Sequence, residues 1–65
     1  MKARDVIRAL EADGWQEVRS RGAHRQFRHP EKPGRVTVSV HGSRDLKIQE
    51  VVSIERQSGL KLRKD

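Results

Sequence analysis

One histidine inside a run of arginines is the feature of this chain that could do chemistry. His24 follows a Gly-Ala pair, and four arginines lie within five residues of it. Histidine both accepts and donates protons near neutral pH, and the planar fork of arginine can hold two phosphate oxygens at once. Acid–base chemistry beside an anionic phosphate suggests RNA cleavage. The candidate phosphate ligands are Arg19, Arg21, Arg25 and Arg28.

RNA cleavage requires few catalytic groups from a protein, because the 2′-hydroxyl of RNA is the nucleophile. A base for the hydroxyl proton, an acid for the leaving 5′-oxygen and cations for the crowded phosphate are enough. His24 is the candidate base or acid, and no metal, cofactor or activated serine is needed. Taken alone, the same residues are equally consistent with a non-catalytic histidine that lies on the solvated surface of a basic strand.

The two other histidines have weaker claims to a catalytic role. His41 could complete an acid–base pair with His24 if neighbouring strands bring both to one face. We favour a structural role for it, in which it caps the end of a strand by bonding the following loop. His29 precedes Pro30 in a predicted turn, and we expect it to be solvated. The spacing of the three histidines matches no usual zinc pattern and no cysteine assists, so we expect no metal site.

The charge of the chain favours a polyanionic partner. The net charge is +6 and the isoelectric point about 10.8, and each cation set against a phosphate releases a condensed counterion. Nucleic acid fits better than a membrane surface, because no helix sets its basic residues against a bulky apolar face. A basic surface that only keeps the protein soluble, or one that meets an acidic protein, would show the same charge.

The length of 65 residues leaves room for one small domain with one core. The chain begins without a secretory leader pattern and contains no apolar run of membrane-spanning length, so we predict a cytoplasmic protein. A core of this size rarely supplies more than about 3–5 kcal/mol, so we expect a partner or an oligomer to add stability. The predicted core side chains are Val6, Ile7, Leu10, Trp15, Val18, Phe27, Val36, Val38, Val40, Leu46, Ile48, Val51, Ile54 and Leu60.

The apolar pattern predicts a helix at each end of the chain. From Ala3 to Leu10 the apolar residues recur at the spacing of one buried helical face, which indicates a helix over residues 2–13. Gly14 is placed to end it in a left-handed conformation, with Trp15 folding back on Leu10. A second, less regular helix begins near residue 48 and stops at residues 58–60, where glycine and an apolar residue follow again. The tail, residues 61–65, is expected to fray beyond residue 62.

Three strands are predicted between the helices. Residues 16–21 and 24–29 flank a turn at residues 22–23, and residues 36–41 alternate apolar and polar side chains. Alternation sets Arg25, Phe27 and His29 on one face of the second strand and His24, Gln26 and Arg28 on the other. With both helices on one face of a three-stranded antiparallel sheet, this is an α+β fold with the α-β-β-β-α layout of double-stranded-RNA-binding domains.

In this order and spacing, several short segments resemble the HicA toxins of bacterial and archaeal toxin–antitoxin systems. The resemblance covers nearly the whole chain. The family has a leucine and then glycine–aromatic at residues 10–15, Gly-Ser-His and an aromatic at residues 22–27, and commonly Val-Pro-x-His at residues 38–41; residues 53–60 also match. The chain departs from the family at Ala23, at Ser39, at residues 48–51 in place of Lys-Gly-Thr-Leu, and at Glu55, where leucine is usual.

HicA toxins are small metal-independent mRNA interferases, so the resemblance implies an endoribonuclease that cleaves mRNA and slows translation. It assigns the catalytic histidine to His24 and implies no cofactor. It also implies a HicB-like antitoxin that forms a hetero-oligomer with the toxin and covers its active site. The alternative hypothesis is a non-catalytic RNA-binding module with the same fold and the same basic face.

Overall fold

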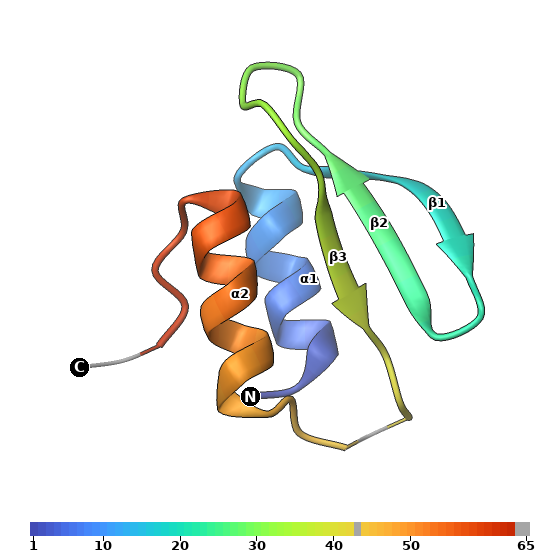
Figure 1. The fold of residues 1–65 in the computed structure, drawn as a ribbon. Coiled ribbons are helices and arrows are strands. Elements are labelled where there is room, and N and C mark those ends of the chain that lie inside the picture. Colours follow the sequence, from blue (N-terminus) through green and yellow to red (C-terminus); the bar gives the residue numbers. More distant parts are fainter. Residues whose placement is uncertain (43, 64–65) are drawn as a thin grey trace.

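The sheet and its two helices follow the predicted order in the structure, a computed structural model that describes residues 1–42 and 44–63. Both helices lie on one side of a three-stranded antiparallel sheet with strand order β1-β2-β3 (Figure 1). The predicted α-β-β-β-α fold is therefore confirmed. The elements are α1 (Ala3–Ala12), β1 (Gln16–Arg21), β2 (His24–Arg28), β3 (Val36–Ser39) and α2 (Ile48–Ser58).

Helix α1 ends as the sequence predicts. Gly14 has a φ of 104°, and its N–H donates to the carbonyl of Glu11 at 3.0 Å. The N–H of Trp15 donates to the carbonyl of Leu10 at 2.9 Å, and both side chains are fully buried. This paired bonding satisfies carbonyls that would otherwise lack partners at the helix end, and it turns Trp15 back into the core. The buried face of α1 consists of Ala3, Val6, Ile7 and Leu10.

The core lies between the two helices and one face of the sheet. Both helices contact β3, and α2 also protects the free edge of this strand, because the side-chain oxygen of Gln57 accepts the N–H of Thr37 at 3.2 Å. Val40, Leu60 and Leu62 pack against the core while partly exposed. The buried core residues are Ala3, Val6, Ile7, Leu10, Trp15, Phe27, Val36, Val38, Leu46, Val51 and Ile54.

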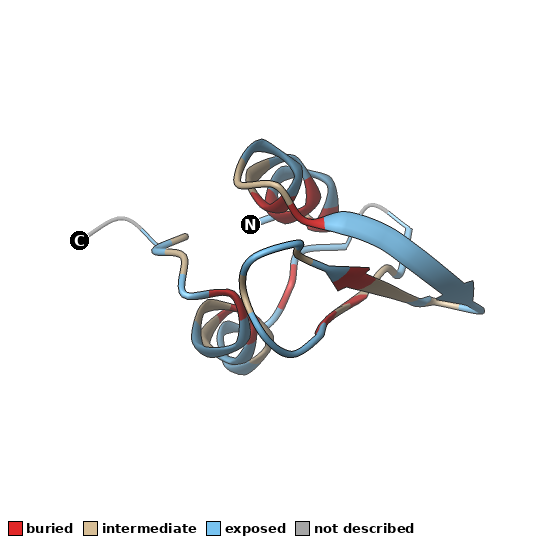
Figure 2. Ribbon diagram, turned by 90° about the horizontal axis from the view of Figure 1, so that it is seen from above, coloured by how far each residue is buried: buried red, intermediate tan, exposed pale blue. Residues whose placement is uncertain are grey.

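Two residues predicted for the core are exposed. Val18 is 55% exposed because β1 extends beyond the helices: all six of its residues are exposed, as Figure 2 shows, and its pairing with β2 is irregular between Glu17 and Arg19. Ile48 is 57% exposed because it lies in the first turn of α2, at the rim of the face that carries the buried residues Val51 and Ile54. The core predictions for Val18 and Ile48 are therefore wrong.

The second and third strands, β2 and β3, end before the predicted residues 29 and 41. Each ends at the residue that pairs with the first residue of the neighbouring strand. β2 ends at Arg28, which pairs with Gln16, the first residue of β1. β3 ends at Ser39, which pairs with His24, the first residue of β2. Beyond Ser39 the chain stays beside the sheet through one bond, from the N–H of Val40 to the carbonyl of residue 23 at 2.7 Å.

His29 is not solvated as expected but holds the end of α1 to the turn after β2. Its Nδ1 accepts the N–H groups of Glu31 and Lys32 at 3.0 and 3.1 Å. Its Nε2 therefore carries the proton and donates to the carbonyl of Asp13 at 2.6 Å. The ring also packs edge-on against Trp15, with centroids 5.3 Å apart. The prediction failed because these backbone groups need partners where solvent is partly excluded.

Lys32 ties the same turn to both helices. Its ammonium group donates to the carboxylate of Asp13 after α1 and, at 3.2 Å, to the carbonyl of Ser58, the last residue of α2. The hydrogen bond from Lys32 lowers the pKa of the Asp13 carboxyl below its ordinary value. The ends of both helices and the turn between β2 and β3 are thus joined at one end of the molecule.

Glu55 fixes the start of the C-terminal tail. Its Oε2 accepts the N–H groups of Leu62 and Arg63 at 2.8 and 3.0 Å, and its Oε1 accepts Nε of Arg63 at 2.9 Å. The bonds to the two backbone N–H groups and to the Arg63 side chain lower the pKa of Glu55. The carboxylate that stands in place of a leucine therefore holds Leu62 against the core. The prediction that the tail frays beyond residue 62 is therefore wrong for Arg63, and residues 64–65 lie outside the described residues.

Gly14→Ala is expected to destabilise the fold by about 2 kcal/mol or more. A methyl group would have to adopt a positive φ and would lie 2.8 Å from Nε2 of His29. Gly34→Ala is the matched control, because Gly34 also has a positive φ but a Cβ there would meet no atom within 4 Å. Urea unfolding followed by circular dichroism compares the two variants. Equal losses would show that the approach to His29 contributes nothing.

Candidate active site

His24 is presented by a tight turn at the tip of the hairpin formed by β1 and β2. Gly22 has a φ of 58°, which lets the chain reverse between the two strands. His24 follows as the first residue of β2 and is exposed. In the register of the sheet it pairs with Arg21 on β1 and with Ser39 on β3.

The pairing defines which side chains share a face with His24. Phe27, Val36 and Val38 are buried against the helices, so the residues between them point to the opposite side, which we call the open face. No aspartate or glutamate occupies one of these positions. The open face consists of Gln16, Arg19 and Arg21 on β1, His24, Gln26 and Arg28 on β2, and Thr37 and Ser39 on β3.

A further arginine joins the open face. Nη1 of Arg35 donates to the side-chain oxygen of Gln26 at 2.9 Å. We did not predict this residue, although alternation along the strand could have found it, because Arg35 directly precedes the inward-facing Val36. The bond orients the Arg35 guanidinium over β2 and adds a fourth arginine to this face.

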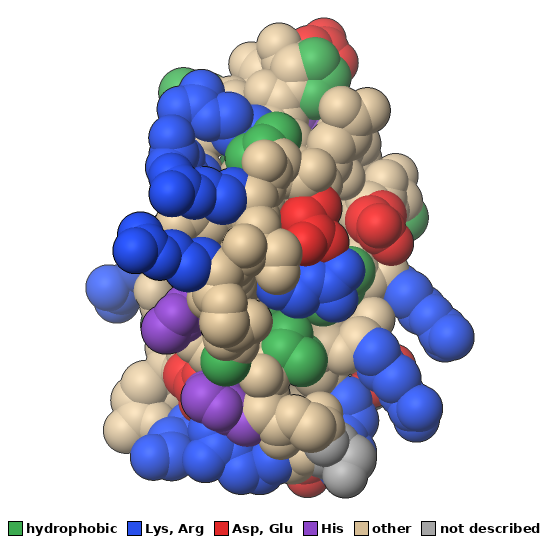
Figure 3. Space-filling view, turned by 90° about the vertical axis from the view of Figure 1, so that its right-hand side faces the viewer, with side chains coloured by type: hydrophobic (Ala, Val, Ile, Leu, Met, Phe, Trp, Pro, Cys, Tyr) green, Lys and Arg blue, Asp and Glu red, His purple; other side chains and the backbone are tan. Residues whose placement is uncertain are grey.

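The distribution of charge on the surface agrees with this register. In Figure 3, lysine and arginine side chains gather along the left-hand side, with histidine beside them, whereas at the centre and on the right they are mixed with carboxylates. A surface with one sign of charge attracts an anion and holds its phosphates by charge-assisted hydrogen bonds. Of the four predicted phosphate ligands, the structure brings Arg19, Arg21 and Arg28 to the face of His24.

Arg25 lies on the other side of the sheet, on the face that carries Phe27. Its Nε donates to Oε1 of Glu17 at 3.0 Å, and its Nη2 contacts the same oxygen. The hydrogen bond lowers the pKa of Glu17 and raises the pKa of Arg25. The structure therefore does not bring this fourth predicted ligand to His24 but engages it in an ion pair.

The three histidines occupy different places. His41 is exposed and follows Val40, which is bonded to the residue before His24, so His41 and His24 lie at the same end of the sheet. His29 follows the far end of β2, where it bonds Asp13. Within residues 1–42 and 44–63, no group of three or more histidine, cysteine, aspartate or glutamate side chains could hold a metal ion.

The chain matches a known protein family along most of its length. A family model described as the HicA toxin of bacterial toxin–antitoxin systems matches residues 3–60, which span every helix and strand of the fold. No curated protein matches the chain significantly. In the part of the chain that the structure describes, no helix has the length and apolar character needed to cross a membrane.

Proposed function

Because the chain belongs to the family of HicA toxins of bacterial toxin–antitoxin systems, we propose that it is a metal-independent endoribonuclease that cleaves mRNA in the cytoplasm and thereby inhibits translation. The observation that carries this proposal is the open face: an exposed histidine, paired across the strand with an arginine, on a face that has four arginines and no carboxylate at its strand positions.

The reaction needs one proton removed and one supplied. The 2′-oxygen of the RNA attacks the adjacent phosphorus, its proton passes to a base, and the 5′-oxygen leaves with a proton from an acid. His24 takes one of these two roles. His41, at the same end of the sheet, is the candidate for the other. The products are a 2′,3′-cyclic phosphate and a 5′-hydroxyl, and no oxidant or cofactor enters the balance.

The arginines of the open face stabilise the charge that develops on the phosphate. Arg21 is directly opposite His24, where paired Cβ atoms lie about 4.5–5.5 Å apart. It is therefore the arginine best placed to contact the phosphate on which His24 acts. Arg19 and Arg28 are further along their strands, so they would bind phosphates of neighbouring nucleotides and fix the path of the RNA.

The family also implies an antitoxin as the partner of this chain. We propose that a HicB-like antitoxin binds the open face in a hetero-oligomer, with acidic groups in place of RNA phosphates. Such a complex would block the substrate. Because the antitoxin binds only the folded state, it would also stabilise a small domain by mass action, by about 2.7 kcal/mol at a free concentration about 100 times Kd.

The ends of the RNA products test the proposed chemistry. We expect a 2′,3′-cyclic phosphate, or the 3′-phosphate formed from it, together with a 5′-hydroxyl. EDTA should leave the rate unchanged, and deoxyribose at the scissile position should prevent cleavage while the analogue still competes for binding. Mass spectrometry of the fragments distinguishes the ends. Products with 5′-phosphates would point to attack by metal-activated water, and RNA that is bound but left intact would indicate a non-catalytic RNA-binding module.

A further inference from the structure

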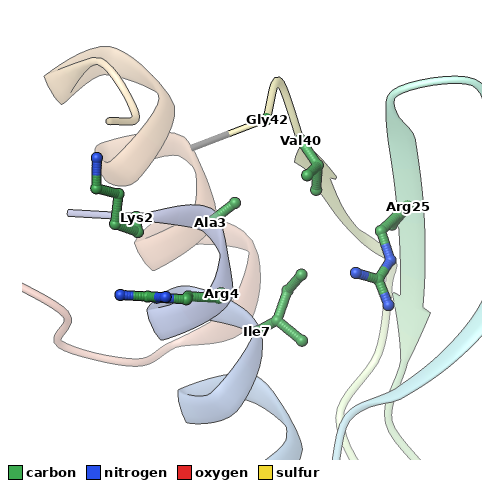
Figure 4. A pocket seen from close by; sticks show the side chains of 7 residues that line it. All are labelled: Lys2, Ala3, Arg4, Ile7, Arg25, Val40 and Gly42. Carbon is green, nitrogen blue, oxygen red and sulfur yellow. The ribbon is translucent and has the colours of Figure 1, made fainter. Parts of the chain in front are cut away.

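A cavity lies on the side of β2 opposite to His24. It has a volume of about 260 Å³ and opens between the first turns of α1, the start of β2 and the residues that follow β3. Ala3, Ile7 and Val40 give it an apolar lining. Figure 4 shows that Ile7 and Arg25 point toward each other across it, whereas the side chains of Lys2 and Arg4 point away.

The ion pair with Glu17 determines which parts of the Arg25 guanidinium group can contact a ligand in this cavity. The hydrogen bonds of a guanidinium group lie in its plane, so the bonds from Nε and Nη2 to Glu17 leave the flat face of the group available. They also neutralise its charge, so an anion would have to compete with the carboxylate. An ion-paired guanidinium group that points across an apolar cavity toward an aliphatic side chain is therefore suited to a flat aromatic ring.

We propose that this cavity is a slot for one nucleobase of the bound RNA, stacked between Arg25 and Ile7. Splayed bases of single-stranded RNA stack on arginine planes in this way. The cavity is smaller than the usual range of about 300–1,000 Å³ for drug-sized ligands, which suits a single base. The inference deepens the proposed ribonuclease function and rests on it, since the slot would position the nucleotide next to the cleaved bond.

The slot and His24 are close enough along the chain to bind one RNA strand. Arg25 directly follows His24, and Val40 is bonded to the residue that precedes His24. The RNA must pass around the end of the sheet, where Gly22 and Gly42 lie. A Cβ at either glycine would meet no atom within 4 Å, so the space around this rim is open. One strand can therefore place a phosphate at the open face and an adjacent base in the slot.

The test uses the methyl resonances of Ile7 and Val40 in the intact chain. The probe is a 2′-O-methyl RNA hexamer, which cannot be cleaved by its own 2′-oxygen, and the control probe is an abasic hexamer with the same backbone. We expect saturable ring-current shifts of both residues with the hexamer and none with the abasic control. Arg25→Lys keeps a cation for Glu17 but loses the planar face, so the hexamer should bind about 5–30-fold more weakly.

The matched variant Arg56→Lys makes the same change on the exposed side of α2 and should leave the affinity unchanged. Thermal melting shows whether Arg25→Lys is folded.

Cleavage of an unmodified RNA is measured separately. Methyl shifts without cleavage would refute the ribonuclease function and leave the proposal of the slot intact. Unmoved Ile7 and Val40 resonances at saturating hexamer would overturn the slot, as would equal shifts with the abasic probe. Shifts that only a tyrosine-containing peptide produces would assign the cavity to a protein partner, and they would also overturn the proposal of a nucleobase slot.

Discussion

His24→Ala is expected to slow RNA cleavage by about 10²–10⁴-fold while stability and RNA affinity stay nearly unchanged. The loss follows from removing the proton carrier. His24 is exposed and lies at the end of a strand, so its ring contributes little to the core. Single-turnover cleavage, RNA titration and thermal melting measure the three quantities on the same preparation. A variant that still cleaves at the parental rate would remove His24 from the mechanism.

The other histidines are the controls for this prediction. His29→Ala should lower the melting temperature, because it removes the partners of the Asp13 carbonyl and of two turn N–H groups, and should leave the cleavage rate of the folded protein intact. His41→Ala decides the second role. A lower rate at an unchanged melting temperature would make His41 the partner of His24, and an unchanged rate would leave it with a structural role.

Charge reversal of Arg19 and Arg21 together should weaken RNA binding by about 10²-fold or more, since each charged hydrogen bond contributes about 1.5–3 kcal/mol. The salt dependence of RNA binding should also fall, by about 0.7 in logarithmic slope for each phosphate that the protein no longer neutralises. If the antitoxin occupies the same face, its affinity should fall in parallel. Titrations of RNA and of the antitoxin at several salt concentrations measure both effects.

The matched control reverses Arg8 and Arg56, which are exposed on the two helices. Each double variant changes the net charge from +6 by four units to +2. A difference in binding affinity between the two variants therefore reflects the positions of the substitutions and not the total charge. If the Arg19 and Arg21 variant lost RNA binding but bound the antitoxin as before, the antitoxin would have to dock elsewhere. The exposed part of α2 around Ile48 would then be the place to examine.

Local patterns predicted the end of α1 well because the interactions there span only a few residues. Gly14 needs a positive φ, and Trp15 has an apolar partner five residues before it, so the sequence contains the whole motif. The same holds for the faces of β2, where alternation correctly separates Phe27 from His24. Short-range rules were sufficient wherever both partners lie in one segment.

Val18 and His29 could not be predicted because their surroundings come from distant parts of the chain. Val18 is a strong strand former, but only the extent of the helices shows that β1 passes beyond them. His29 reads as a turn residue, yet its partner Asp13 is 16 positions away. For the candidate site, the run of arginines identified the basic region, whereas Glu17 and Gln26 decide how Arg25 and Arg35 are used.

The two helices run in the same direction, and this gives the molecule an electrical polarity. Both begin at the end of the sheet where His24 and His41 lie and finish at the end joined by Lys32 (Figure 1). Each helix carries about half a positive charge at its start and half a negative charge at its finish. Lys32 offsets the negative ends, whereas Asp5 in the first turn of α1 and Glu50 in the first turn of α2 offset part of the positive charge at the other end. The part of the positive charge that remains at the helix starts reinforces the attraction of an anionic strand to the end of the domain where His24 and His41 lie.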